Sequence, residues 1–393
     1  MKAERPRVIV IGCGFGGIEA VRALSKAAVE ITVVDRTNHH LFQPLLYQVA
    51  TAGLSAPAVS APIRHALRKE MRRGNLTILQ GEVTAIDAVR RRVVLDRSDE
   101  ADAADTLAYD HLIVASGSTH SYFGHPDWEA HAPGLKTLAD AFAIRAKVIG
   151  AFEQAERCTD PAAREPARAA EQLARLGVDL RTGCKVTGID ADGVTYETRD
   201  GAATASHRLA AKTVIWAAGV AATPLGRSLG AATGATVDRA GRVVVEPDLS
   251  LPDHPEIAVI GDLAAALSHG PGEPKPVPGV SPGAKQMGRT AAKNLLRRLR
   301  GEPTQAFRYI DYGNLATVGR KAAVVDLGVP GFGALRFSGL LAWLFWLFAH
   351  IYFLIGFRNR LTVMVDWAWA YVTYERSARV VAQPPAASRK TAS

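Results

Sequence analysis

Apolar runs near the N-terminus have the spacing of two strands separated by a helix. The run Val8–Ile11 is followed by Gly-Cys-Gly-Phe-Gly-Gly at residues 12–17 and by a helix-like segment. A second run, Ile31–Val34, ends at Asp35. A strand, a glycine turn, a helix and a strand ending in an acid form the fingerprint of dinucleotide binding. The pattern therefore predicts an FAD or NAD site in an α/β fold of Rossmann type.

The glycines of this turn have separate expected roles. Gly12 allows a tight turn, Gly14 lets the main chain approach a pyrophosphate, and Gly17 lets the helix pack closely on the strand. The pyrophosphate would then lie on unpaired N–H groups at the helix N-terminus. Asp35 is placed to accept a hydrogen bond from a ribose hydroxyl.

Short apolar runs predict further strands. Three of them end in small residues, which fits a parallel sheet whose carboxyl ends line a ligand crevice. These are 112–114 before Ala115-Ser116-Gly117, 214–216 before Ala217-Ala218-Gly219, and 257–260 before Gly261-Asp262. Taken singly, each is more often a plain strand end than a site. Other runs predict strands at 76–79, 83–86 and 93–95, and residues 56–71 predict a helix with a basic exposed side.

The most apolar segment is Gly339–Phe357, which is 19 residues long and carries no formal charge. As one helix it would reach about 28 Å, close to the ~30 Å hydrocarbon thickness of a bilayer. His350 in its middle and aromatic residues spread along its length argue against a span, as does Asp366 beyond it. An in-plane membrane anchor is the favoured interpretation; a single span and a buried core or dimer surface stay open.

Composition narrows the class of protein. A chain of 393 residues has room for two or three domains, and it has a net charge of +9. No nucleic-acid-binding motif accompanies the basic excess, which suits an anionic membrane surface instead. Cys13, Cys158 and Cys184 form no C-x-x-C pair or disulfide framework, and no secretory signal precedes the first strand. A reducing compartment is expected.

Longer stretches carry a family resemblance. The chain resembles the type II NADH dehydrogenases, single-subunit NADH:quinone oxidoreductases that do not pump protons. The matching stretches are 38–52 (NHHLFQPLLYQVATA), 109–124 (YDHLIVASGSTHSYFG), 215–220 (IWAAGV), 258–263 (AVIGDL), 278–288 (PGVSPGAKQMG) and 351–365. They extend over most of the chain, which is far more specific than a glycine fingerprint.

The resemblance assigns roles to individual residues. The ADP half of FAD would be held by Gly12, Gly14, Phe15, Gly16, Gly17 and Asp35. Val83 would meet the adenine through its backbone, Ser116-Gly117 would contact the middle of the cofactor, and Gly261-Asp262 would contact its ribityl region. Lys285 and Gln286, after Ala284, would lie near the isoalloxazine ring and the quinone entrance and are the expected catalytic residues.

One part of the family pattern is missing. Enzymes of this type carry a second nucleotide fold for NADH, and a βαβ unit takes about 30 residues. Here only residues 167–177 separate Arg164-Glu165-Pro166, where that fold should begin, from Val178-Asp179-Leu180 near its end. Those 11 residues contain no glycine except Gly177. The second fingerprint, its phosphate-binding helix and its ribose acid are therefore expected to be absent, through a natural deletion or an error in the gene sequence.

Two functions follow from this pattern. By family the chain is an FAD-dependent NADH:quinone oxidoreductase whose NADH oxidation is impaired, because the groups that hold the ADP half of NADH are gone. The alternative is an FAD-binding, membrane-associated protein without NADH dehydrogenase activity. The deletion would also leave the strands expected at 178–180, 194–196 and 214–216 without parallel partners.

The predicted organisation has four parts. Residues 1–118 and 251–330 form the FAD-binding domain, 119–250 a truncated NADH-binding domain, 331–381 hydrophobic C-terminal helices that serve as a membrane anchor, and 382–393 a disordered tail. The expected partners are a membrane quinone and a lipid bilayer surface, with no nucleic acid and a possible homodimer. The resemblance implies a peripheral location on the cytoplasmic face of the bacterial inner membrane.

Two sharper hypotheses are set aside. His39-His40 suggests a metal, but no further ligand stands at metal spacing, so no metal site is expected. Sulfide:quinone reductase, a relative with a redox cysteine pair, is disfavoured because no cysteine follows residue 184.

Overall fold

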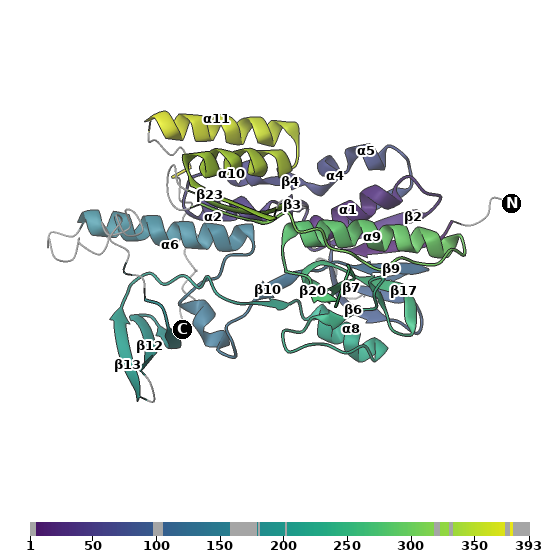
Figure 1. The fold of residues 1–393 in the computed structure, drawn as a ribbon, viewed down its shortest axis with the longest axis horizontal. Helices are drawn as coiled ribbons and strands as arrows, with labels where there is room; N and C mark the ends of the chain where they lie inside the picture. Colours follow the sequence, from purple (N-terminus) through teal and green to yellow (C-terminus); the bar gives the residue numbers. More distant parts are fainter. Residues whose placement is uncertain are drawn as a thin grey trace, which may run out of the picture.

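The structure is a computed structural model that describes residues 5–96, 105–157, 179, 181–200, 203–317, 323–329, 333–373 and 378–379. Its centre is a six-stranded sheet in the order β16-β17-β9-β1-β2-β5 (Figure 1). The strands are β1 (Arg7–Ile11), β2 (Glu30–Asp35), β5 (Leu76–Gln80), β9 (His111–Val114), β16 (Ser250–Leu251) and β17 (His254–Val259). All pairs are parallel except the edge strand β16, which runs antiparallel to β17.

The predicted strand–turn–helix–strand unit is present as β1, α1 (Phe15–Leu24) and β2. The apolar residues of β1 and β2 are buried, as a central parallel strand covered on both faces requires. On one side α1 packs against α9 (Ser281–Leu299). Figure 1 shows β6 (Glu82–Asp87), β7 (Arg92–Asp96) and α8 (Leu225–Thr233) on the opposite side of the sheet. β8 (Asp105–Ala108) completes the small antiparallel sheet of β6 and β7.

Residues 118–222 have a different architecture. β10 (Ser118–His120) pairs antiparallel with β14 (Val220–Ala222), and η2 (Pro126–Ala130) and α6 (Leu138–Arg157) follow β10. β11 (Cys184–Asp190), β12 (Gly193–Asp200) and β13 (Ala203–Ala210) form an antiparallel meander. Every strand pairing of the described residues between 119 and 213 is antiparallel.

The strand predicted at 214–216 was wrong. Residues 211–219 belong to no helix or strand, and Ile215 is 43% exposed. Trp216 is held instead by its backbone N–H, which donates to the carbonyl of Pro133, and by its indole N–H, which donates to that of Ser121. An apolar run becomes a parallel strand only where a neighbouring strand offers a ladder, and the described residues offer none here.

The helix predicted at 56–71 was also wrong in part. The segment consists of α3 (Ala56–Val59), β4 (Ser60–Pro62), α4 (Ile63–Ala66) and α5 (Arg68–Met71). Pro62 lacks an N–H and favours an extended conformation in the residue before it, so the helix stops and β4 pairs with β3 (His39–Leu41). Shorter elements nearby and in the second half are η1 (Gln43–Leu45), α2 (Leu46–Ala50), β15 (Val243–Val244), η3 (Gly261–Leu263), β18 (Ala264–Ala265), β19 (Leu267–Ser268) and β20 (Lys275–Pro276).

The C-terminal segment begins with the antiparallel strands β21 (Asn314–Thr317), β22 (Ala323–Val329) and β23 (Gly333–Gly339). The apolar stretch after them is two helices, α10 (Leu340–Phe353) and α11 (Phe357–Thr373), which lie side by side in Figure 1. Gly356, with φ +86°, makes the turn between them. At 14 residues α10 reaches only about 21 Å, so the 19-residue stretch does not form the single helix of about 28 Å considered from the sequence. None of the helices in the described part of the chain has the length and apolar character needed to cross a bilayer.

Several predictions fall on residues outside those that the structure describes. These are the strand positions 178 and 180, the residues 164–177 around the expected deletion, Cys158, and the tail 382–393.

Candidate functional site

The glycine turn lies where the carboxyl ends of β1 and β9 meet. Gly12 has φ +89°, and a Cβ atom there would stand 2.4 Å from the carbonyl oxygen of Ala115, the residue that follows β9. Its N–H donates to the carbonyl of Val34 in β2 at 2.8 Å. Only glycine meets both demands, the left-handed conformation and the close approach of a neighbouring strand end. The turn that the sequence predicted is therefore present.

The other glycines press α1 against its surroundings. A Cβ on Gly17 would lie 1.9 Å from the carbonyl oxygen of Gly12, and one on Gly288 of α9 would lie 2.2 Å from that of Gly16. A Cβ on Gly16 would lie 3.1 Å from the carbonyl oxygen of Ala284. These approaches fix the N-terminus of α1 between the turn and α9 (Figure 1).

Gly14 differs from its neighbours because it faces open space. Among the described residues no heavy atom lies within 4 Å of the position its Cβ would take, and it caps α1 without a side-chain hydrogen bond. The first-turn N–H groups of a helix have no partner within the helix, and no acidic side chain lies in the first turn of α1. Free N–H groups at an open helix N-terminus are the chemistry that a pyrophosphate requires, so these residues fit a dinucleotide cofactor.

Asp35 ends β2 beside the turn. Its Oδ2 accepts the N–H of Cys13 at 2.7 Å, and its Oδ1 accepts the N–H and the hydroxyl of Thr37, both at 2.8 Å. These bonds fix the carboxylate, whose remaining lone pairs can still accept a ribose hydroxyl. The carbonyl of Asp35 also accepts the N–H of Gly81, which brings the start of β6 alongside it. Val83 follows in β6, buried, at a register shift between Val83 and Ala85.

The second strand end carries Ser116 and Gly117. The hydroxyls of Ser116 and Thr223 are 2.6 Å apart, and the carbonyl of Gly117, at φ +73°, accepts the N–H of Thr223 at 3.3 Å. The sequence did not predict the role of Thr223, because it stands 107 positions after Ser116 and no local pattern connects the two.

The third strand end brings Gly261 and Asp262 to the same edge. Gly261 has φ +71°, and Asp262 Oδ2 accepts the hydroxyl of Ser118 at 2.8 Å. The same hydroxyl accepts a hydrogen bond from Lys136 Nζ at 3.0 Å. Ser118 and Lys136 were not predicted as site residues, although Ser118 directly follows the Ser116-Gly117 pair. A carboxylate, a hydroxyl and an ammonium group thus form one polar chain beside the cradle.

The two expected catalytic residues have different surroundings. The amide of Gln286 donates from Nε2 to the carbonyl of Ile310 and accepts at Oε1 from its N–H, both at 2.9 Å. Both ends of that side chain therefore hold the backbone near residue 310. Lys285 Nζ lies over the rings of Phe15, at 5.1 Å from the centroid, and Phe353, at 4.7 Å. Through these two ring contacts Lys285 connects the nucleotide turn to the end of α10. Burial lowers the pKa of Lys285.

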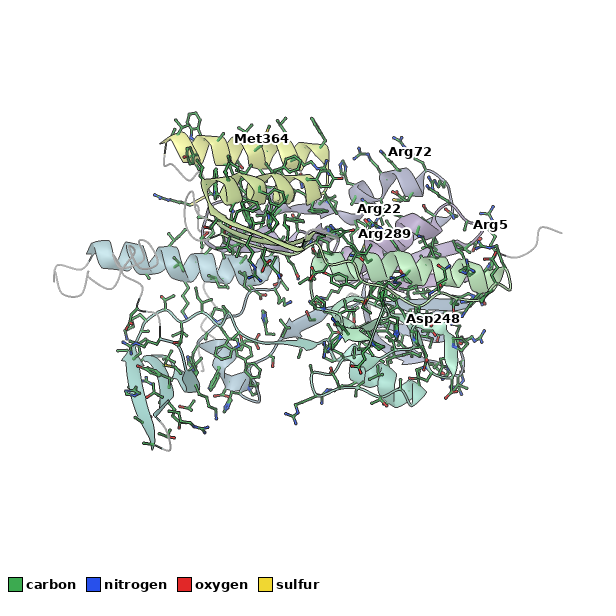
Figure 2. The ribbon with its side chains drawn as sticks, in the orientation of Figure 1. Arg5, Arg22, Arg72, Asp248, Arg289 and Met364 are labelled. Atoms are coloured by element: carbon green, nitrogen blue, oxygen red, sulfur yellow. The ribbon has the colours of Figure 1, made fainter. Side chains whose placement is uncertain are left out.

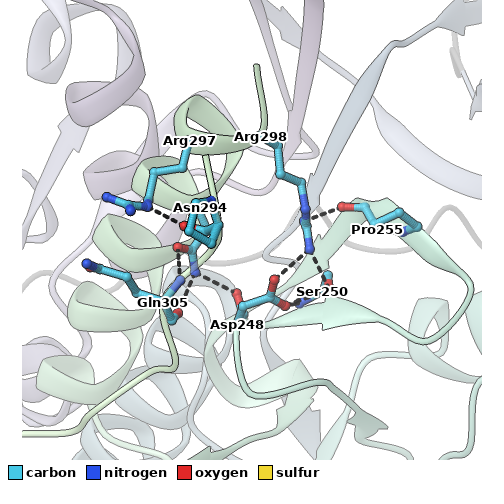
Figure 3. Close-up of polar contacts among 8 residues, drawn as sticks. Asp248, Ser250, Pro255, Asn294, Arg297, Arg298 and Gln305 are labelled. Carbon is cyan, nitrogen blue, oxygen red and sulfur yellow. Dashed lines mark hydrogen bonds and ion pairs between the residues drawn. The ribbon is translucent and has the colours of Figure 1, made fainter. Parts of the chain in front are cut away.

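A cavity of about 630 Å³ lies elsewhere, lined by Asp248, Asp253 and Arg298 among others. Asp253 and Pro255 stand at the start of β17, so this cavity opens at the amino ends of the parallel strands. Ligands of open α/β sheets bind at the carboxyl ends, where the glycine turn and Asp262 lie. Asp248 and Arg298 are bonded to each other and to neighbouring groups, so we assign the cavity no ligand (Figure 3).

The fold and this cradle define a class of dinucleotide-binding α/β proteins. The model of the pyridine nucleotide-disulphide oxidoreductases matches residues 6–151 and 138–288, and that of the NDH2 C-terminal domain matches residues 312–373. The chain is 35% identical to the type II NADH:quinone oxidoreductase Ndh of Mycobacterium tuberculosis, over 98% of this chain and 92% of that protein. The type II NADH:quinone oxidoreductase NdhA of the same organism is also 35% identical, over 94% of this chain and 87% of that protein.

Solved structures share the fold. NDH2 of Plasmodium falciparum, solved with NADH, superposes with a TM-score of 0.77 at 17% identity, over 95% of this chain and 100% of that one. The chain therefore belongs to the type II NADH:quinone oxidoreductase family, as the sequence stretches indicated. Membership brings FAD as cofactor, NADH as electron donor and quinone as acceptor.

Proposed function

We propose that this chain is an FAD-dependent NADH:quinone oxidoreductase that keeps its flavin cradle and has lost most of its affinity for NADH. The observation that carries the first part is the cradle: Gly14 faces open space at an uncapped helix N-terminus. When bound, FAD would supply the redox chemistry of a two-electron transfer from NADH to quinone. In this proposal the turn from Gly12 to Gly17 binds its pyrophosphate, Asp35 its ribose, and Val83 its adenine.

The rest of the cradle orients the cofactor. Ser116 and Gly117 would contact its middle, and Gly261 and Asp262 its ribityl chain. Lys285 and Gln286 would line the quinone side, Lys285 with its ammonium between two aromatic rings and Gln286 through the backbone that it holds. A partly buried ammonium with a lowered pKa is a suitable hydrogen-bond donor to a quinone oxygen.

Two observations support the loss of the NADH fold. The described residues between 119 and 213 pair only antiparallel, whereas a nucleotide fold needs parallel strands around a glycine turn. The alignment with the mycobacterial Ndh spans 449 positions, 56 more than the 393 residues of this chain. At least 56 alignment positions therefore have no counterpart here, which is enough for a βαβ unit.

The consequence for NADH is a large loss of binding energy. Each N–H bond to an anionic oxygen contributes about 1.5–3 kcal/mol, and the helix dipole adds about 0.3–1 kcal/mol. Contacts to the remote ADP half also support the reactive geometry, so both affinity and hydride transfer decline.

The test separates the two half-reactions. Purified protein loaded with FAD is mixed with NADH in a stopped-flow instrument, and flavin bleaching is followed. A second sample is reduced with dithionite and mixed with a soluble quinone. We expect slow or absent bleaching by NADH but prompt reoxidation by quinone. Fast bleaching at ordinary NADH concentrations would overturn the impairment. A flavin inert to both would favour the alternative, an FAD-binding protein without NADH dehydrogenase activity.

The C-terminal helices support membrane association. Leu341, Phe348, Phe357 and Val372 are between 65% and 80% exposed, and further apolar side chains of α10 and α11 accompany them. In Figure 2 Met364 lies on α11, at the outer edge of the molecule. We propose that this face rests in the plane of a bilayer, peripherally on the cytoplasmic side. A second copy of the chain covering the same face is the competing proposal.

The domain division remains part of the proposal. The core of the FAD-binding part contains residues from β1, β2, β9 and β17, and it also contains Ala222, Leu225 and Val243. We therefore propose that the second segment of the FAD-binding part begins near residue 222 instead of residue 251. The segments 1–118 and 331–381 keep their predicted limits.

A further inference from the structure

His40 is a buried imidazole attached to the nucleotide turn. It lies in β3, it is 2% exposed, and its Nδ1 is 2.9 Å from the carbonyl oxygen of Cys13. A carbonyl only accepts, so Nδ1 carries the proton and Nε2 the lone pair. Among the described residues Nε2 has no hydrogen-bond partner. The bond to Cys13 is thus the one polar contact that these residues give the ring.

Cys13 is held on both sides. Its N–H donates to Asp35 Oδ2 at 2.7 Å, and its carbonyl accepts from His40. The carbonyl of Cys13 and the N–H of Gly14 belong to one trans peptide unit, in which the two groups point in opposite directions. Fixing the carbonyl toward His40 therefore turns the Gly14 N–H away from it, at the residue whose Cβ position is open.

We propose that His40 is a positioning residue for the cofactor: by holding the Cys13 carbonyl, it aims the Gly14 N–H at the pyrophosphate. The inference rests on the proposed placement of FAD at this turn. The His40 ring cannot rotate freely, because it packs edge-on against the ring of Phe15, with 5.2 Å between the two ring centroids. Burial lowers its pKa to about 4, so the imidazole is neutral near pH 7 and brings no charge into the site.

The experiment replaces the donor and measures FAD affinity. In His40→Asn the side-chain NH₂ stands where Nδ1 stood; in His40→Leu no donor remains. The matched control is His39→Leu, since His39 is the neighbouring residue and, within the described part of the chain, its ring bonds to the adjacent Asn38 alone. Each apoprotein is titrated into FAD while quenching of flavin fluorescence is followed, and the unfolding midpoint of the apoprotein is recorded.

We expect His40→Leu to weaken FAD binding about tenfold or more, because the Gly14 N–H would no longer be held toward the anionic pyrophosphate and one charge-assisted hydrogen bond to it would be lost. His40→Asn and His39→Leu should stay within about threefold of the parent. Equal affinity of His40→Leu and the parent overturns the inference, as does a lower unfolding midpoint with unchanged affinity. If His40→Leu fails to fold, His40→Gln replaces it. The amide of Gln reaches the position of Nε2 and not that of Nδ1, so His40→Gln should bind FAD weakly while His40→Asn binds it well. Equal FAD affinities of these two variants would refute the positioning role of His40. A parent protein that binds no FAD refutes the proposed cofactor site instead.

Discussion

At the residue scale, Gly14 and Gly17 belong to one turn but have opposite surroundings. A Cβ on Gly17 would strike the carbonyl of Gly12, whereas one on Gly14 would meet nothing. The sequence motif treats both as glycines of one fingerprint. Their positions in the fold separate a glycine needed for packing from one needed for a ligand.

Gly17→Ala and Gly14→Ala should therefore fail in different ways. We expect Gly17→Ala to destabilise the apoprotein by about 1–3 kcal/mol, because backbone must move to admit the methyl group. Gly14→Ala should change stability by no more than about 1 kcal/mol, yet weaken FAD binding by tenfold or more, because the methyl group occupies the place of the pyrophosphate. Thermal unfolding of the apoproteins and fluorescence titration with FAD measure the two effects. Loss of affinity and stability together in Gly14→Ala would contradict this separation.

At the element scale, α9 is tied to the edge of the sheet by a polar cluster (Figure 3). Arg298 Nη2 lies 2.5 Å from Asp248 Oδ2, and the Asn294 amide donates to the carbonyls of Asp248 and Gln305. Asp248 Oδ1 accepts the N–H and hydroxyl of Ser250. The side chains of Arg298 and Asp248 are 25% and 11% exposed, so water screens the pair less than a surface pair.

Removing the charge of Asp248 should weaken this attachment in a pH-dependent way. Burial raises the pKa of Asp248, but the hydrogen bonds of Ser250 and Thr304 and the charge of Arg298 hold it below the usual value. A carboxyl with a lowered pKa stabilises the fold above its unfolded pKa, about 3.9, and loses that effect as the pH falls through the folded pKa. Asp248→Asn should therefore cost about 1–3 kcal/mol at pH 7. The difference from the parent should shrink below about pH 4.

Urea unfolding at a series of pH values measures this difference. The control is Arg300→Gln. The ion pair of Arg300 with Glu302 is exposed, so removing it should leave stability unchanged. A difference between parent and Asp248→Asn that is constant down to pH 2 would show that the charge of Asp248 contributes nothing.

At the scale of the whole molecule, the apolar side chains of α10 and α11 are exposed together on one helix pair. Contiguous exposed apolar patches mark sites of interaction with a membrane or another protein. The double variant Leu341→Glu with Phe348→Glu should abolish sedimentation with vesicles of anionic lipid. Each inserted Leu or Phe side chain contributes about 1.5–3 kcal/mol, so losing two removes most of a peripheral attachment. Val89→Glu, at an even more exposed position outside the helix pair, serves as control.

Vesicle sedimentation and light scattering in solution distinguish the two possible covers. Binding that persists in the double variant would refute the bilayer contact. A dimer of the parent that becomes a monomer in the double variant, without any vesicle binding by the parent, would assign the face to a second copy.

Part of the site could be read from the sequence because its causes are local. Gly12 needs a left-handed conformation, β1 and β2 need continuous apolar runs, and Asp35 ends a strand; each requirement is met within a few residues. Long stretches such as 38–52 were specific enough to indicate the family. The break at Gly356 also had a local cause, although the apolar run hid it.

What the tertiary structure alone decided is which distant residues meet. The contacts of His40 with Cys13, Gln286 with Ile310, and Ser118 with Lys136 and Asp262 join residues 18 to 144 positions apart. The run at 214–216 has the composition of a strand but no neighbour to pair with among the described residues. Composition and spacing report the preference of each segment for a conformation. A hydrogen bond or a sheet ladder also needs a partner, and only the folded chain places that partner.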